Sequence, residues 1–71
     1  MIDVESEVTG RVWQLHCEVG QQVAEDDVLM ILESMKMEIP VLAPADGTVA
    51  EILVAVEEAV DEDQVLARLS D

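Results

Sequence analysis

Lys36 is the only lysine in the chain, and its immediate neighbours are unusual for a surface turn. It stands between Met35 and Met37 in the stretch ESMKME. A lysine amine that has lost its proton can attack an activated acyl group, and flexible thioether side chains suit recognition by a partner protein. The two methionines therefore indicate a lysine turn that a partner protein recognises. The charge pattern alone also fits a solvated turn lysine whose charge is offset by Glu33 and Glu38.

Two apolar runs flank this stretch and predict a hairpin with Lys36 at its tip. Val28–Leu32 precedes the polar residues and Ile39–Leu42 follows them. A strand, a polar tip and a second strand would bring the tip residues to the edge of the protein. Pro40 lies in the second run, so we expect that strand to lose no ladder hydrogen bond at this position.

The sequence repeats itself at an offset of 37 residues, which aligns residues 10–33 with residues 47–70. Most of the identical positions are apolar or turn residues, so the repeat indicates a folding unit. The identical pairs are Gly10/Gly47, Val12/Val49, Val19/Val56, Val23/Val60, Glu25/Glu62, Asp26/Asp63, Val28/Val65, Leu29/Leu66 and Leu32/Leu69.

Each half of the repeat predicts short β-strands separated by turns. The expected strands are 12–19, a brief segment at 23, 28–32, 49–56, a brief segment at 60, and 65–69. In both halves the apolar alternation slips after the first valine, Val12 or Val49, which predicts a shared β-bulge. Neither half can bury its apolar faces alone, so we expect a small antiparallel sandwich or flattened barrel with approximate two-fold symmetry.

This symmetry makes two further predictions. The position equivalent to Lys36 falls next to the end of the chain, so Lys36 should lie at one pole of the domain and both termini at the other. Glu57 replaces Gly20 in the second half, which strains that turn if it needs a positive φ.

The charge of the chain argues against one class of function. The chain has 17 acidic and 3 basic residues, and its formal net charge is −14. Such a surface argues against nucleic-acid binding. It fits plain solubility, attraction to basic patches on protein partners, or adaptation to a saline cytoplasm. The same charge favours a monomer.

The sequence also predicts a cytoplasmic protein. The single cysteine, Cys17, can form no internal disulfide and no paired-cysteine metal site. The first residues have no signal-peptide pattern, and no apolar run is long enough to span a membrane. Cys17 and His16 are adjacent, so on a strand they point to opposite faces and cannot act as nucleophile and base. We expect Cys17 in the core and His16 outside. Trp13 is expected to pack across a sheet edge, with partner binding as the alternative.

The stretch ESMKME resembles the biotin attachment sequence of biotin carboxyl carrier proteins and biotinyl domains, written EAMKM or ESMKM. Residues 10–28 resemble the first half of these domains. The segment APADGTV at 43–49 is similar to their AP-x-x-G-x-V pattern, and residues 65–67 to their closing strand. The resemblance implies one all-β biotinyl domain over residues 1–71, with the barrel-sandwich hybrid fold of two four-stranded antiparallel sheets.

The resemblance also implies a function. Biotin protein ligase would attach biotin covalently to Lys36, with Met35 and Met37 as recognition elements and contributions from Glu33, Ser34 and Glu38. The non-catalytic carrier would then move carboxybiotin between the biotin carboxylase and carboxyltransferase subunits of a biotin-dependent acyl-CoA carboxylase. The family's inserted "thumb" has no counterpart here. The chain resembles the small free-standing biotin/lipoyl attachment proteins, or a fragment of a longer carboxylase chain.

Two other functions share the same fold. A lipoyl domain would serve a 2-oxoacid dehydrogenase or a glycine cleavage system, but such domains usually carry Asp-Lys followed by a small residue, whereas Met35 and Met37 flank Lys36 here. An adaptor module would leave Lys36 unmodified. The sequence offers no constellation of catalytic residues for an enzyme.

Overall fold

The computed structural model describes all 71 residues and consists of eight β-strands without a helix. The strands are β1 (Ile2–Glu5), β2 (Gly10–Leu15), β3 (Gln22–Val23), β4 (Val28–Ser34), β5 (Met37–Leu42), β6 (Gly47–Ile52), β7 (Ala59–Val60) and β8 (Val65–Ser70). No helix is present that could cross a membrane.

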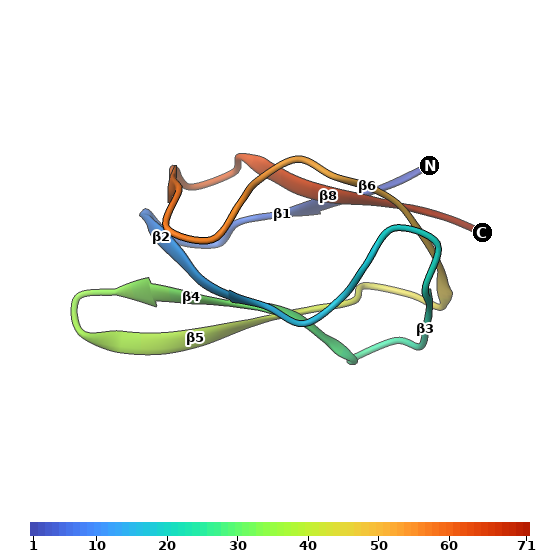
Figure 1. Cartoon of the computed structure of the whole chain (residues 1–71), viewed down its shortest axis with the longest axis horizontal. Helices are drawn as coiled ribbons and strands as arrows, with labels where there is room; N and C mark the ends of the chain where they lie inside the picture. Colours follow the sequence, from blue (N-terminus) through green and yellow to red (C-terminus); the bar gives the residue numbers. More distant parts are fainter.

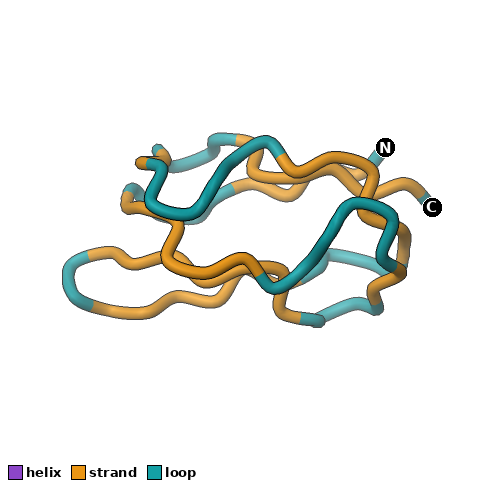
Figure 2. Tube along the Cα trace, viewed as in Figure 1, coloured by secondary structure: helices purple, strands orange, loops and turns teal.

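The strands form two four-stranded sheets, ordered β1-β8-β6-β3 and β5-β4-β2-β7, and every paired neighbour is antiparallel. Figures 1 and 2 show the sheets as two layers of an elongated sandwich, with loops crossing between them. The principal extents are 33 × 17 × 16 Å. The predicted fold class, a flattened barrel of two four-stranded sheets, is confirmed.

The predicted two-fold symmetry is visible in the strand order and in the bulges. Shifting β2, β3 and β4 by 37 residues gives β6, β7 and β8, so each sheet order is the image of the other, with β5 equivalent to β1. The register shifts between Val12 and Gln14 in one sheet and between Val49 and Glu51 in the other. The shared bulge is therefore confirmed, and its extra residues are Trp13 and Ala50.

Close backbone approach explains the repeated glycines Gly10 and Gly47. A Cβ on Gly10 would collide with the carbonyl oxygen of Glu33, and one on Gly47 would lie 2.7 Å from the carbonyl oxygen of Ser70. Gly10 thus lets β2 lie close to the end of β4, and Gly47 lets β6 lie close to the end of β8. The hairpin that carries Lys36 starts at this end of β4.

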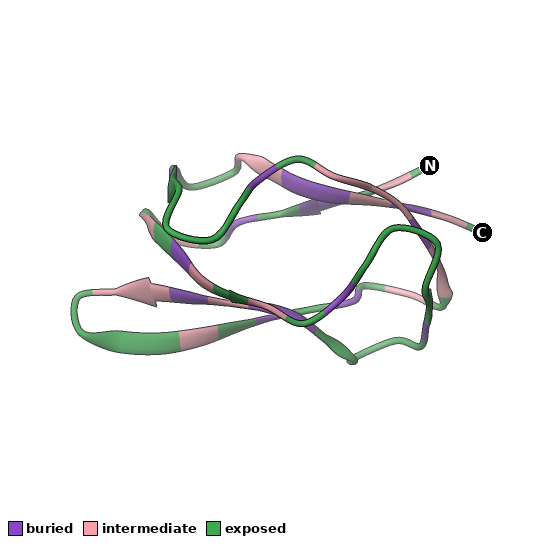
Figure 3. Ribbon diagram, viewed as in Figure 1, coloured by how far each residue is buried: buried purple, intermediate pink, exposed green.

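The core lies between the sheets and contains 15 buried apolar side chains, mostly Val and Leu. Figure 3 shows buried residues along the strands of both layers and exposed ones at the turns. Cys17 is buried and His16 is exposed, as predicted. The one buried polar side chain, Ser6, donates a hydrogen bond of 2.7 Å to the carbonyl oxygen of Val8.

Some strand limits differ from the prediction. The strands expected at 12–19 and 49–56 end at Leu15 and Ile52. Just beyond these ends, the His16 N–H donates to the carbonyl oxygen of Leu29 and the Leu53 N–H to that of Leu66. β1 was not predicted. It is held in the sheet by pairing with β8, which lies at the other end of the sequence. Trp13 is the half-buried bulge residue, beyond the two residues of β2 that pair with β7. Pro40 lies on β5, an edge strand, where proline is tolerated.

Candidate functional site: the lysine hairpin

The hairpin formed by β4 and β5 carries Lys36 in a two-residue turn. Ser34 pairs with Met37, and between them Met35 and Lys36 have φ angles of 52° and 66°. A two-residue hairpin loop with two positive φ angles is the type I′ arrangement, which usually contains Asn and Gly. Residues with a Cβ pay a conformational cost there. Met35 and Lys36 are therefore residues that this backbone conformation does not favour.

The tip of this hairpin is open to solvent. The side chains of Met35 and Met37 are 92% and 63% exposed, and Lys36 and Glu38 are exposed as well. Figure 1 shows the turn at one end of the molecule and both termini at the other. The predicted separation into two poles is therefore confirmed.

The first two residues of the stretch, Glu33 and Ser34, are held by the body of the protein. The Nε and Nη2 groups of Arg11 donate to Glu33 Oε1 at 3.0 and 2.8 Å, and Ser34 Oγ donates to the carbonyl oxygen of Thr9 at 2.8 Å. Glu33 therefore does not offset the charge of Lys36, as one interpretation of the charge pattern assumed. It offsets the charge of Arg11.

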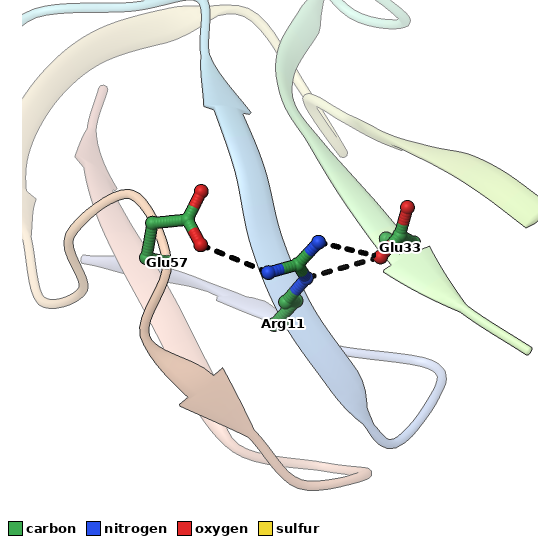
Figure 4. Close-up of polar contacts among 3 residues, drawn as sticks. All are labelled: Arg11, Glu33 and Glu57. Carbon is green, nitrogen blue, oxygen red and sulfur yellow. Dashed lines mark hydrogen bonds and ion pairs between the residues drawn. The ribbon is translucent and has the colours of Figure 1, made fainter. Parts of the chain in front are cut away.

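Arg11 is a residue that the sequence analysis missed. Its Nη1 group also donates to Glu57 Oε2 at 2.8 Å, so one guanidinium bridges two carboxylates (Figure 4). The hydrogen bonds that Arg11 donates to Glu33, and then the negative charges of Glu33 and Glu57, raise the pKa of Arg11 above its ordinary value. The register between β2 and β4 could have indicated this contact, because it places Arg11 directly opposite Glu33.

These ion pairs leave Lys36 as the only cationic side chain without a partner. Arg11 and Arg68 each contact two carboxylates, Arg68 those of Asp3 and Glu51, whereas Lys36 takes part in no salt bridge. No cluster of His, Cys, Asp or Glu is suited to hold a metal ion. What the site offers is a single amine on a projecting turn. Such an amine fits the attachment of a group by another protein, which must reach and acylate it.

Comparison with known proteins defines the class of this domain. The family model described as "Biotin-requiring enzyme", a biotin and lipoyl attachment family, matches residues 1–69. The chain belongs to this family.

Two small bacterial proteins are similar over nearly their whole length. A biotinylated protein TB7.3 homolog of Mycobacterium leprae is 40% identical over 68 residues, covering 96% of this chain and 96% of that protein. The biotin/lipoyl attachment protein of Bacillus subtilis is 39% identical over 67 residues, covering 94% and 92%. With the family match, they identify the chain as a biotin-carrier type of attachment domain.

Solved structures show the same architecture both within a much longer chain and as a separate domain of similar length. The urea carboxylase of Kluyveromyces lactis superposes with a TM-score of 0.91 at 34% identity, covering 96% of this chain but 6% of that one. The lipoyl domain of the Azotobacter vinelandii 2-oxoglutarate dehydrogenase complex superposes with a TM-score of 0.83 at 28% identity, covering 100% and 98%. The fold is thus shared by a part of a urea carboxylase and by a lipoyl domain.

Proposed function

We propose that Lys36 is the attachment residue and that it carries biotin. The observation that supports this most directly is the position of its amine: on an exposed turn, without an ion-pair partner, between two exposed methionines. The remaining cations are occupied by carboxylates, so no other amine or guanidinium side chain is comparably available.

The chemistry at Lys36 is an acyl transfer. The ammonium loses a proton to a base of the ligase, and Nζ then attacks the acyl carbon of a biotinyl adenylate. An amide bond forms and AMP leaves. Only the neutral amine is a nucleophile, so the ligase has to position the Lys36 side chain and remove its proton. A projecting turn lets the ligase surround the amine.

Within the stretch, the structure supports different roles for different residues. Met35 and Met37 have exposed side chains that contribute nothing to the core, which supports their role in ligase recognition. Glu38 is exposed and adds negative charge beside the turn. Glu33 and Ser34 are tied to Arg11 and Thr9, so their contribution to recognition runs through the placement of the hairpin.

The wider role that we propose is that of a carrier in a biotin-dependent carboxylase. Bound biotin would accept a carboxyl group at a biotin carboxylase site and release it at a carboxyltransferase site. A match to the biotin carboxyl carrier protein of acetyl-CoA carboxylase from Streptococcus pyogenes, 41% identical over 51 residues, supports this role. That match covers 31% of the Streptococcus protein. We further propose that residues 1–71 act as one domain, monomeric and cytoplasmic.

Lipoylation of Lys36 is the second candidate. The lipoyl domain from Azotobacter has the same fold over the whole chain, which is the observation in its favour. The name of the Mycobacterium relative, a biotinylated protein, and the paired methionines favour biotin.

Intact mass spectrometry tests this proposal. The protein is co-expressed with a biotin ligase and biotin, beside a Lys36→Arg variant and a lipoate-ligase control. One biotin-sized increase that disappears in the variant supports biotin on Lys36. An adduct with lipoate ligase alone would assign the domain to acyl-transfer complexes, and no adduct with either ligase would leave an unmodified module. Either of these results would contradict the proposal.

A further inference from the structure

The two-fold symmetry provides an internal comparison for the lysine pole. Both poles are built from the same strands and bulges, so residues that differ between them are not required by the fold itself. At the lysine pole, Arg11 lies opposite Glu33 in the ladder. At the pole of the termini, the equivalent pair is Thr48 opposite Ser70. An ion pair thus stands at one pole where two hydroxyl groups suffice at the other.

Glu57 is the third residue that differs. It has a φ of 77°, and the equivalent residue of the other half is Gly20, with a φ of 94°. The backbones of the two turns are held alike, because the Glu57 N–H donates to Val12 O at 2.7 Å and the Gly20 N–H donates to Val49 O at 2.8 Å. Glycine would fit this turn without the cost that a Cβ brings at positive φ. In return, the Glu57 carboxylate binds Arg11 at 2.8 Å.

The position of this triad is the base of the hairpin. The pairing of β2 with β4 ends at Arg11 and Glu33, and beyond this pair β4 has only β5 as a neighbour. Figure 4 shows Arg11 on β2, with Glu33 near the end of β4 on one side and Glu57 in the turn before β7 on the other. The triad therefore joins Glu33, the last residue of β4 that pairs with β2, to the turn before β7, three residues before Lys36. Ser34, the next residue, is held separately through Thr9.

We propose that Arg11, held from the other side by Glu57, is a positioning residue for Lys36. The triad sets the direction in which the hairpin leaves the sheet, and with it the geometry in which the ligase meets the amine. This rests on the proposed modification of Lys36. It also gives Glu33 a role in the fold, since both Arg11 hydrogen bonds to this residue end on its Oε1 atom.

Two substitutions test this inference without altering the ESMKME stretch. Arg11→Thr and Glu57→Gly each introduce the residue that already serves the opposite pole, so both variants should fold. Arg68→Thr is the matched control, because Arg68 also contacts two carboxylates, but on the other sheet. Three readouts apply: KM and kcat for biotinylation, amide hydrogen exchange of residues 34–37, and the salt dependence of both.

Exposed ion pairs are weak, so the expected effects are modest. We expect Arg11→Thr to raise the ligase KM for this protein by roughly two- to fivefold with little change in kcat. Hydrogen exchange at 34–37 should accelerate by a similar factor. Glu57→Gly should also raise the KM and accelerate the hydrogen exchange, whereas Arg68→Thr should change neither quantity. The difference from wild type should shrink in 1 M salt, where the Debye length is about 3 Å.

Two results would overturn the inference while leaving the proposed function intact. Unchanged KM and exchange in Arg11→Thr would mean that the triad does not position the hairpin. A lower KM would mean that Arg11 shields Glu33 from a ligase that binds it directly. If wild type accepts no biotin, the proposed function fails, and the hydrogen-exchange comparison still decides whether the triad fixes the hairpin.

Discussion

Glu57 and Gly20 occupy equivalent turns in the two halves of the protein, and both have a positive φ, 77° and 94°. The turn geometry is thus imposed by the repeated fold and not by the residue that happens to stand there. No heavy atom outside its chain neighbours lies within 4 Å of the Cβ that a side chain at Gly20 would add. Any cost of a substitution at Gly20 is therefore conformational.

We expect Gly20→Ala to destabilise the fold by about 1 kcal/mol. The left-handed conformation costs a residue with a Cβ about 1–2 kcal/mol, and the smaller entropy of the unfolded alanine chain offsets part of it. Glu57→Gly should change the free energy of unfolding by less than about 1 kcal/mol, because relief of that cost is offset by the lost Arg11 contact and a more flexible unfolded chain. Urea unfolding measures both. Equal losses in the two variants would contradict this account.

Much of the fold could be predicted because it depends on the sequence pattern near each residue. The repeat placed the bulges, the strained turn at Glu57 and the two poles correctly. The apolar residues between the turns are enough to specify strands that share one core. β1 was missed because a four-residue strand has little pattern of its own and is ordered by β8. The early end of β2 was missed because the residues after the bulge keep alternating in the sequence.

The site could be predicted only in part. The resemblance indicated Lys36 and its methionines, and the hairpin follows from the flanking apolar runs. The partners of Glu33 and Ser34 could not be found in this way, because Arg11 and Thr9 lie more than 20 residues away along the chain. Whether a surface glutamate is free or paired depends on register and on side-chain geometry, and charge pattern alone contains neither.

Alanine at the two repeated glycines should be far more damaging than at Gly20, for a steric reason. At Gly10 the added Cβ would collide with the carbonyl of Glu33, and at Gly47 it would lie 2.7 Å from the carbonyl of Ser70. These backbone atoms cannot move away without breaking hydrogen bonds between the paired strands. We expect losses of about 1–3 kcal/mol or more, larger for Gly10→Ala. Thermal unfolding of the two variants measures the order, and a milder effect at Gly10 would contradict it.

The buried thiol of Cys17 predicts a loss of stability at alkaline pH. Burial raises the pKa of Cys17 because the thiolate would be poorly solvated. A free thiol has a pKa of about 8.5, so above this pH the unfolded chain loses the proton first. The contribution to stability is full below that value and declines as the pH rises toward the pKa of the folded state.

Chemical unfolding between pH 7.5 and pH 10 measures this decline, with Cys17→Ala as the control. The variant should be less stable at every pH, because it leaves a cavity in the core. Its stability should nevertheless fall less steeply over this range than that of the wild type. Equal slopes would assign the alkaline loss to other groups.

The net charge of −14 predicts that salt stabilises this protein. At 0.01 M salt the Debye length is about 30 Å, close to the 33 Å length of the molecule, so nearly all of the unpaired carboxylates repel one another. This repulsion penalises the compact state more than the unfolded chain. Raising the salt to 0.5 M should increase the free energy of unfolding by on the order of 1 kcal/mol, even though it also weakens the few exposed ion pairs.

Glu7→Lys separates this charge effect from other actions of salt. Glu7 is exposed and its carboxylate makes no salt bridge, so the substitution reduces the net charge without breaking a contact. The variant should be more stable than the wild type at low salt and should gain less when salt is added. If both proteins gain equally, the stabilisation comes from a general salt effect on apolar burial, and repulsion among the carboxylates is not what limits the stability of the domain.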